Sequence, residues 1–388
     1  MKSRLCFAVN LILVVLFLFS LNLNAQNNVN REMSKDYQTT RIRKTFFIPD
    51  IPGYVTLKGD FHTHTCFSDG SVWPDFRVTE AWAEGLDIIA ITDHIENRPN
   101  RNVLPEDLNL GYKLAVSKAD QLNILFIPGA EITKKMPNPG HFNALFVQDV
   151  NKLTDEDPMK QIEEAINQGA FILWNHPGSS WIRPIIDTTK LWDFHKKLLD
   201  KEWIHGIEVF NTDEWFPIAL EWCIKKNLTV FSNTDIHTPI NYWYDLSNRY
   251  SHRAMTLVFA KSRSLEAVKD ALFDKKTIGF FGNTLVGSED LITELFNASI
   301  IFNKLSRQRT RGSRTISFIK LENPTDLPFI LKKKGDWKNN DRSDIIELLP
   351  RSSFIVNYSD EFKHPEFELL NCYYGINKHP IIKMPLIK

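Results

Sequence analysis

Apolar and polar positions along residues 55–273 alternate in a way that predicts repeated strands and helices. Residues 87–92 (DIIAIT) form a continuous apolar run, which is typical of a strand buried in a parallel sheet. Residues 74–84 are amphipathic, begin with a proline and are followed by Gly85. Proline in the first turn and glycine just after the end are typical of helices. About seven such strand and helix units follow one another, and this pattern predicts a barrel of the (β/α) kind.

The expected elements divide the chain into a barrel and a second region. Expected strands are 55–60, 87–92, 124–127, 142–147, 170–174, 206–210, 228–232 and 254–260, and expected helices are 74–84, 105–121, 158–168, 188–201, 214–226 and 265–273. After about Asn283 only short strand candidates remain, at 315–321, 328–331, 353–356 and 367–370. We therefore expect a barrel over 45–283 and a small β-rich C-terminal domain over 284–388.

The first 25 residues have the layout of a secretory signal peptide. Lys2 and Arg4 precede an apolar run over 5–19, and the chain turns polar around Ala25, a small residue suited to cleavage. The run is shorter than the roughly 20 residues that span a bilayer; an uncleaved N-terminal anchor is the alternative. Residues 26–44 are polar and predict a linker. We expect an exported protein, periplasmic or extracellular, with no transmembrane segment in the mature chain.

Charge and cysteine content exclude several classes of protein. The 388 residues include 47 basic and 47 acidic side chains, a balance that argues against nucleic acid as a partner. Of four cysteines, Cys6 lies in the leader, and Cys66, Cys223 and Cys372 are far apart with no CxxC pair. A disulfide scaffold and a zinc ribbon are therefore both disfavoured. The sequence does not indicate an oligomeric state.

Histidine and carboxylate residues gather where the predicted strands end. In a barrel enzyme the carboxyl ends of the strands are where catalytic side chains converge. Residues two apart on an extended chain point the same way, so the histidines of HTH can share one ion. Imidazole with carboxylate suits Zn²⁺, Fe²⁺ or Mn²⁺, and nine candidates imply two or three ions. The candidates are His62, His64, Asp69, His94, Glu131, His141, His176, Asp235 and His237.

Each of these signals is weak alone, because paired histidines or an Asp–His pair more often serve packing. Their conjunction, in order and each after an apolar run, predicts a metal site at one face of the barrel. The other histidines beyond the leader have ordinary structural roles in this interpretation, except His252, which precedes a strand and is ambiguous.

The segments HTHTCFSDG, EAWAEGLDIIAITDH, PGAEI, NHPG and SNTDIH together resemble the polymerase and histidinol phosphatase (PHP) domain. The resemblance runs from about Lys58 to Gly282. It implies a distorted (β/α)7 TIM-like barrel with a two- or three-metal centre. The leader, WNHPG, GNTLVGSED and the β-rich tail are similar to the secreted Sb-PDE family phosphodiesterases.

Carried over residue by residue, the resemblance implies a division of the ligands among three divalent ions, Mn²⁺, Zn²⁺ or Fe²⁺. Glu131 bridges two ions in this division, and Glu131, Asp235 and His237 are assigned catalytic roles. The first ion has His62, His64, Glu131 and Asp235; the second has Glu131, His141 and His176; the third has Asp69, His94 and His237.

The function implied is hydrolysis of a small phosphodiester, with a hydroxide bridging two ions as the nucleophile. Arg183 and Arg253 are candidates to bind substrate phosphate, although a packing role is the alternative for each. Few other basic residues adjoin the motifs, which favours a monoanionic diester. A phosphomonoesterase of the histidinol-phosphatase type and a non-catalytic, metal-stabilised binding module are the alternatives.

Overall fold

The structure, a computed structural model, describes residues 43–178, 189–247, 251–309, 315–335, 344–359 and 365–384. The predicted signal peptide and most of the predicted linker lie outside these residues. Within the described ranges, no helix has the length and apolar character needed to cross a membrane.

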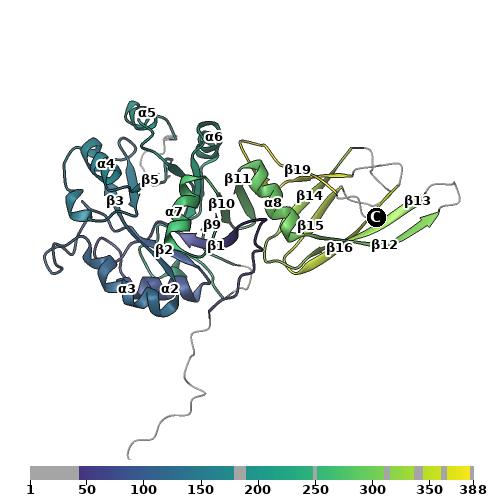
Figure 1. Cartoon of the computed structure of the whole chain (residues 1–388), viewed down its shortest axis with the longest axis horizontal. Helices are drawn as coiled ribbons and strands as arrows, with labels where there is room; N and C mark the ends of the chain where they lie inside the picture. The colour runs from purple at the N-terminus through teal and green to yellow at the C-terminus, as the bar shows by residue number, and fades with distance from the viewer. Residues whose placement is uncertain are drawn as a thin grey trace, which may run out of the picture. The chain divides into compact units, whose positions relative to one another are not determined.

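One large sheet forms the barrel region (Figure 1). Its twelve strands run in the order β18-β11-β10-β9-β1-β2-β3-β4-β5-β6-β7, with β8 paired to β6. The strands are β1 (Val55–Asp60), β2 (Ile88–Ile91), β3 (Leu125–Thr133), β4 (His141–Leu145), β5 (Phe171–Trp174), β6 (Gly206–Asn211), β7 (Glu214–Trp215), β8 (Thr229–Asn233), β9 (Met255–Ala260), β10 (Thr277–Phe281), β11 (Thr284–Gly287) and β18 (Cys372–Tyr373).

The sheet is mixed, whereas the sequence pattern predicts repeated parallel units. β1, β2 and β3 are parallel, as are β5, β6 and β8, but β4 runs antiparallel to both of its neighbours. Residues 134–140 between β3 and β4 are too few for a crossover helix, so the two strands form a hairpin. β9 and β10 are also antiparallel to their neighbours, whereas β11 is antiparallel to β10 and parallel to β18.

The chain segments that follow β1 and β8 meet at the carboxyl ends of the strands. Thr63 and Ile236 form a parallel bridge. The His64 amide donates to the Ile236 carbonyl at 3.1 Å, and the Asp235 amide donates to the His62 carbonyl at 2.9 Å. Two segments about 170 residues apart in the chain are thereby held side by side.

Helices lie outside the strands (Figure 1). They are α2 (Pro74–Ala83), α3 (Leu110–Leu122), α4 (Pro158–Asn167), α5 (Asp193–Asp200), α6 (Pro217–Lys226), α7 (Leu265–Phe273) and α8 (Glu289–Ser299). Proline occupies the first turn of α2, α4 and α6, where it fits without losing a hydrogen bond. α3 begins five residues later than predicted, because the side chain of Asp107 accepts from the amide of Asn109 and from Asn151 and holds a turn there.

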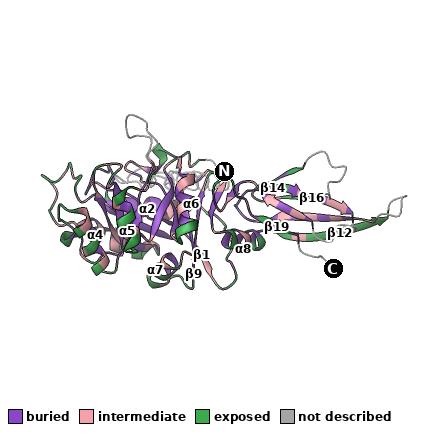
Figure 2. Cartoon of the chain, turned by 90° about the horizontal axis from the view of Figure 1, so that it is seen from above, coloured by how far each residue is buried: buried purple, intermediate pink, exposed green. Residues whose placement is uncertain are grey.

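Burial explains why the strand pattern could be found in the sequence. Every residue of β2, β5, β6, β8 and β9 is buried, as expected for strands covered on both faces. Figure 2 shows these buried strands enclosed by helices whose outward sides are exposed.

The C-terminal region contains a helix that the sequence analysis missed. α8 begins after Ser288, whose side chain accepts from the Leu291 amide, and buries Leu295 and Phe296. Apart from β18, the described strands beyond it are β12 (Ile301–Arg309), β13 (Thr315–Asn323), β14 (Phe329–Lys334), β15 (Ile345–Leu348), β16 (Ser352–Ser359), β17 (Glu366–Leu369) and β19 (Ile381–Lys383). They form one sheet of order β12-β13-β16 and another of order β15-β14-β17-β19.

The barrel sheet and the C-terminal sheets share a continuous hydrophobic core. One cluster of buried side chains includes Phe280 and Leu285 from the barrel sheet, Phe296 from α8, and Phe329 and Phe367 from the C-terminal strands. β18, which lies between β17 and β19 in sequence, pairs with β11 of the barrel sheet. The predicted boundary at 283/284 falls between β10 and β11, which are paired along their length.

Candidate metal centre

The structure brings all nine predicted ligands together at the carboxyl ends of the barrel strands. They come from the loop after β1, from β3 and β4, and from the segments after β2, β5 and β8. Each has a side-chain nitrogen or oxygen within 3.7 Å of another member of the set. Segments from six strands therefore meet at one point, as in the active sites of barrel enzymes.

Glu131 lies at the middle of the set and is completely buried. Its Oε1 faces the ring nitrogens of His62 at 3.6 Å, His141 at 3.1 Å and His176 at 3.7 Å. Its Oε2 faces those of His64 at 3.6 Å and His94 at 2.6 Å. The two oxygens thus face different histidines, which is the arrangement of a bridging carboxylate.

Among the described residues, three groups have ligand atoms close enough to share an ion. Each group has its ligand atoms within 4.8 Å of one another, and His62 and His64 each belong to two groups. The division implied by the family resemblance instead placed His62 and His64 on one ion only and grouped His141 with His176. The groups are His64, Asp69, His94 and His237; His62, His64 and Asp235; and His62, Glu131 and His176.

The polar atoms that point into the centre fit a cation. Nε2 of His62 and of His64, Oε2 of Glu131 and Oδ1 of Asp235 are buried and face one another at 2.9–3.6 Å without a hydrogen bond of adequate geometry. Buried polar atoms are nearly always hydrogen-bonded, so several such atoms converging on one place call for another partner. Imidazole nitrogens and carboxylate oxygens together are ligands for divalent transition metals.

The charge states of these groups suit metal binding. Burial and the imidazoles of His237 and His94 lower the pKa of His64 well below its ordinary value, so that ring is neutral. Burial would raise the pKa of Asp235, but His62 and His64 reverse this and lower it. Burial lowers the pKa of His94, but Glu131 and Asp69 raise it to about 9. Ions that bind here would displace the proton of His94, as metals do at protonated ligands.

Nδ1 of His62 and Nδ1 of His94 each contact a group outside the ligand set, and Nδ1 of His94 also faces Glu131 Oε2. His62 Nδ1 lies 2.8 Å from Oε1 of Glu208. His94 Nδ1 lies 2.6 Å from the hydroxyl of Thr133. Such contacts fix the tautomer and orientation of a ligating imidazole. The sequence analysis missed both residues; a lone glutamate inside the apolar run GIEVFN (206–211) was the signal that could have revealed Glu208.

Two further charged residues fix the loops that carry the ligands. Arg77 of α2 is fully buried and donates to the carbonyls of His64, Ile236 and Thr238 at 2.9–3.2 Å. Asp93 accepts from the amide and hydroxyl of Thr65 at 2.6 Å each and from Ser68 at 2.7 Å. Asp93 therefore supports the loop after His64.

The assignment of Arg253 as a substrate residue is wrong in this structure. Its side chain is 1% exposed and forms an ion pair with Asp60 at the end of β1, so it cannot reach a substrate. The other candidate, Arg183, lies outside the described residues. His252, which was ambiguous, packs on Phe280 and lies near the carbonyls of Arg253 and Gly282, away from the centre.

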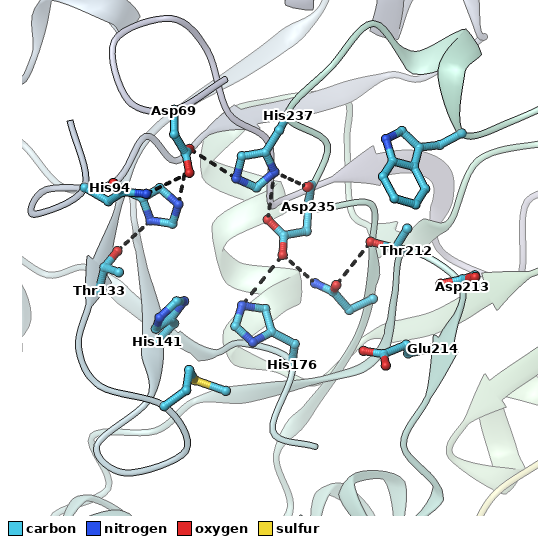
Figure 3. Close-up of a pocket in the computed structure, with 14 residues that line it drawn as sticks. Asp69, His94, Thr133, His141, His176, Thr212, Asp213, Glu214, Asp235 and His237 are labelled. Carbon is cyan, nitrogen blue, oxygen red and sulfur yellow. Dashed lines mark hydrogen bonds and ion pairs between the residues drawn. The ribbon is translucent and has the colours of Figure 1, made fainter. Parts of the chain in front are cut away.

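A cavity of about 560 Å³ opens over the centre. Figure 3 shows the lining residues Asp69, His94, His141, His176, Asp235 and His237 gathered together, with Asp213 and Glu214 to the right of them. Met136 and Trp243 also line it, and among the described lining residues there is no lysine or arginine. The cavity has the size of a small-molecule site.

Fold and site together define a metal-dependent hydrolase of the barrel type. The comparisons with known proteins narrow this class. No family model and no curated protein matches the chain. A crystal structure from Bacteroides vulgatus, of a two-domain protein containing a predicted PHP-like metal-dependent phosphoesterase, matches with a TM-score of 0.83 and 38% identity over 89% of this chain and 99% of that one. The chain belongs to this family of PHP-like metal-dependent phosphoesterases.

Two other solved structures are similar to about half of this chain at low sequence identity. A metal-dependent phosphoesterase from Bifidobacterium adolescentis is 16% identical, with a TM-score of 0.36, over 47% of this chain and 88% of that chain. An amidohydrolase from Chromobacterium violaceum is 15% identical, with a TM-score of 0.34, over the same shares.

Proposed function

We propose that this protein is an exported phosphodiesterase that hydrolyses a small-molecule diester at a centre of two or three divalent ions. The centre would be held by the nine residues described above. Bound ions would supply Lewis acidity and would lower the pKa of water from 15.7 toward about 7. We propose the Sb-PDE family as the subfamily, on the sequence resemblance described above. The layout of the first 25 residues supports export.

The observation that carries the diester preference is the charge of the cavity. Beyond the predicted ligands, the described lining contains the carboxylates Asp213 and Glu214 and no lysine or arginine. A phosphomonoester carries nearly two negative charges at neutral pH and a diester carries one, so the repulsion from these carboxylates is smaller for a diester. A diester also has a second alcohol group, which the outer part of the cavity would contact.

The three residues assigned to catalysis have distinct positions. Glu131 spans the inner histidines with its two oxygens, as described above. Asp235 Oδ1 lies 3.1 Å from His62 Nε2 and 2.9 Å from His64 Nε2, so it holds these rings toward one point. His237 lines the cavity, and its Nδ1 donates to the Asp235 carbonyl at 2.7 Å. Its Nε2 faces Asp69 at 3.2 Å; burial lowers the pKa of His237, but Asp69 and Asp235 raise it above its ordinary value.

The test is a comparison of bis(p-nitrophenyl) phosphate with p-nitrophenyl phosphate, using chelator-stripped protein refilled with Mn²⁺ or Zn²⁺. We expect faster, metal-dependent hydrolysis of the diester. His64→Gln should abolish turnover, whereas His379→Gln, a matched change at a histidine that contacts the Cys372 carbonyl in the C-terminal region, should not. Faster monoester hydrolysis would instead indicate a phosphatase. Turnover of neither ester by protein that holds its ions would favour the binding module.

A further inference from the structure

Glu208 is a buried carboxylate that no part of the proposed reaction uses directly. It lies in the middle of β6 and is 0% exposed. Its Oε1 accepts from His62 Nδ1 at 2.8 Å and from Asn233 Nδ2 at 2.9 Å. Its Oε2 accepts from the His176 amide and from Asn211 Nδ2, both at 2.8 Å. Two oxygens thus receive four N–H groups from four strand ends.

The position of these contacts indicates a role beyond packing. A carboxylate buried in an apolar strand has a large desolvation cost unless it is fully hydrogen-bonded. Two of the four donors belong to predicted metal ligands. Because a carboxylate accepts, His62 carries a proton on Nδ1, and Nε2 is the ring nitrogen left to bind an ion at the centre. The contact with the His176 amide holds a residue with a φ of +25°, a backbone conformation that needs support.

The rest of the centre has weaker support of this kind. Outside the ligand set His94 Nδ1 contacts the neutral hydroxyl of Thr133, and within it Glu131 Oε2 at 2.6 Å; His237 donates to a backbone carbonyl. The Ser68 hydroxyl is 3.5 Å from His64 Nδ1. The side chains of Asp69 and His237 are 27% and 34% exposed, whereas those of His62 and Glu131 are completely buried. The charge of the partner outside the ligand set, a carboxylate for His62 and neutral groups for His64, His94 and His237, therefore separates an inner from an outer group of ligands, although His64 is itself completely buried.

We propose that Glu208 is a positioning residue that makes the inner group, His62, Glu131 and His176, bind its ion more tightly than the outer group, His64, Asp69, His94 and His237. A charged acceptor raises the basicity of a ligating imidazole and fixes its orientation, and loss of such a contact typically weakens metal binding about 10–100-fold. The inner ion is then permanent, and the outer ion exchanges with the medium.

The experiment is a Co²⁺ titration of the full-length, chelator-stripped protein against a competing chelator, followed by visible absorption. We expect two classes of site in the wild type. Glu208→Gln removes the charge and turns an N–H₂ group toward two donors. It should weaken the tight class about 10–100-fold and alter its absorption band, and leave the weak class unchanged. Asp69→Asn should have the reverse effect.

Asp87→Asn is the matched control. Asp87 is another mostly buried carboxylate with several donors, Lys58, Arg43 and Arg263, but it precedes β2, at the other end of the strand. It should lower thermal stability and leave Co²⁺ binding unchanged. If Glu208→Gln does not fold, Glu208→Asp, which keeps the charge but shortens the side chain, replaces it with the same expected weakening.

Unchanged affinity of the tight class in a folded Glu208 variant would overturn the proposal, as would equal weakening of both classes. The proposal rests on the metal centre of the proposed function and not on the ester hydrolysed. A wild-type protein that binds no Co²⁺ would refute both. A wild type that binds Co²⁺ in two classes but hydrolyses neither ester would refute only the proposed reaction.

Discussion

Replacing Arg77 with methionine should loosen the two loops that carry five of the nine predicted ligands. Arg77 joins the carbonyl of His64 to those of Ile236 and Thr238, and it pairs with Glu80 at 2.7 Å. Although burial lowers the pKa of Arg77 to about 10, the side chain stays charged at neutral pH. It is therefore a charged donor shared between two loops.

The magnitude follows from what methionine would leave behind. Glu80, 8% exposed, would keep its hydrogen bond from the Ile240 amide at 2.9 Å but lose its cation. Removing one partner of a buried pair costs about 3–5 kcal/mol. The carbonyls of His64 and Thr238 would also lose their charged donor. For a chain of this size, a loss of that much free energy of unfolding corresponds to a melting temperature about 5–10 °C lower.

Thermal unfolding and metal titration separate the two effects. In Arg77→Met/Glu80→Gln the unpaired charge is absent, so part of the stability should return, while metal affinity should stay low because the loops are still unanchored. Glu80→Gln alone is the control for the carboxylate. A fall in melting temperature with unchanged metal affinity in Arg77→Met would refute the reasoning, since Arg77 would then stabilise the fold without positioning the ligands.

Three other changes test separate parts of the structure. Gly70→Ala places a Cβ 2.7 Å from the Thr65 amide nitrogen and 2.8 Å from the His64 carbonyl carbon, so metal affinity should fall at least about tenfold; unchanged affinity would mean that the loop adapts. Chelation should lower the melting temperature by several degrees and refilling should restore it, because ligands that bind only the folded state stabilise it. Burial would raise the pKa of Asp87, but Lys58 reverses this and lowers it below its ordinary value, so its stabilisation is present at neutral pH and is lost as the pH falls below about 4. Asp87→Asn should therefore flatten the acid dependence of unfolding, and an unchanged profile would contradict this.

The sequence predicted most of the barrel elements because their signals are local. Apolar runs such as 87–92 and prolines such as Pro74 mark strands and helix starts directly. The antiparallel direction of β4 was not predicted, because it depends on the length of the connection to β3 and not on the residues of either strand. α8 was missed although Ser288 begins an amphipathic stretch, because the region was interpreted as β-rich throughout.

Ligands were easier to find than the residues that support them. Motifs such as HTH and DIH place chemically recognisable side chains next to strand ends. Glu208 and Arg77 have no such motif, and their roles depend on partners more than 100 and 150 residues away in the chain. Arg253 illustrates the opposite error. A basic residue before a strand suggested a phosphate contact, but its place beside Asp60 could not be derived from local sequence.

The pairing of β11 with β18 has a consequence for synthesis of the chain. β11 ends at Gly287 and its partner begins at Cys372, so the ribosome must add about 85 residues before this edge of the barrel sheet can be covered. During that interval the edge of β11 would expose unpaired amides and carbonyls, which favour aggregation. Nascent chains and C-terminal truncations that lack β18 are therefore the forms most in need of a chaperone.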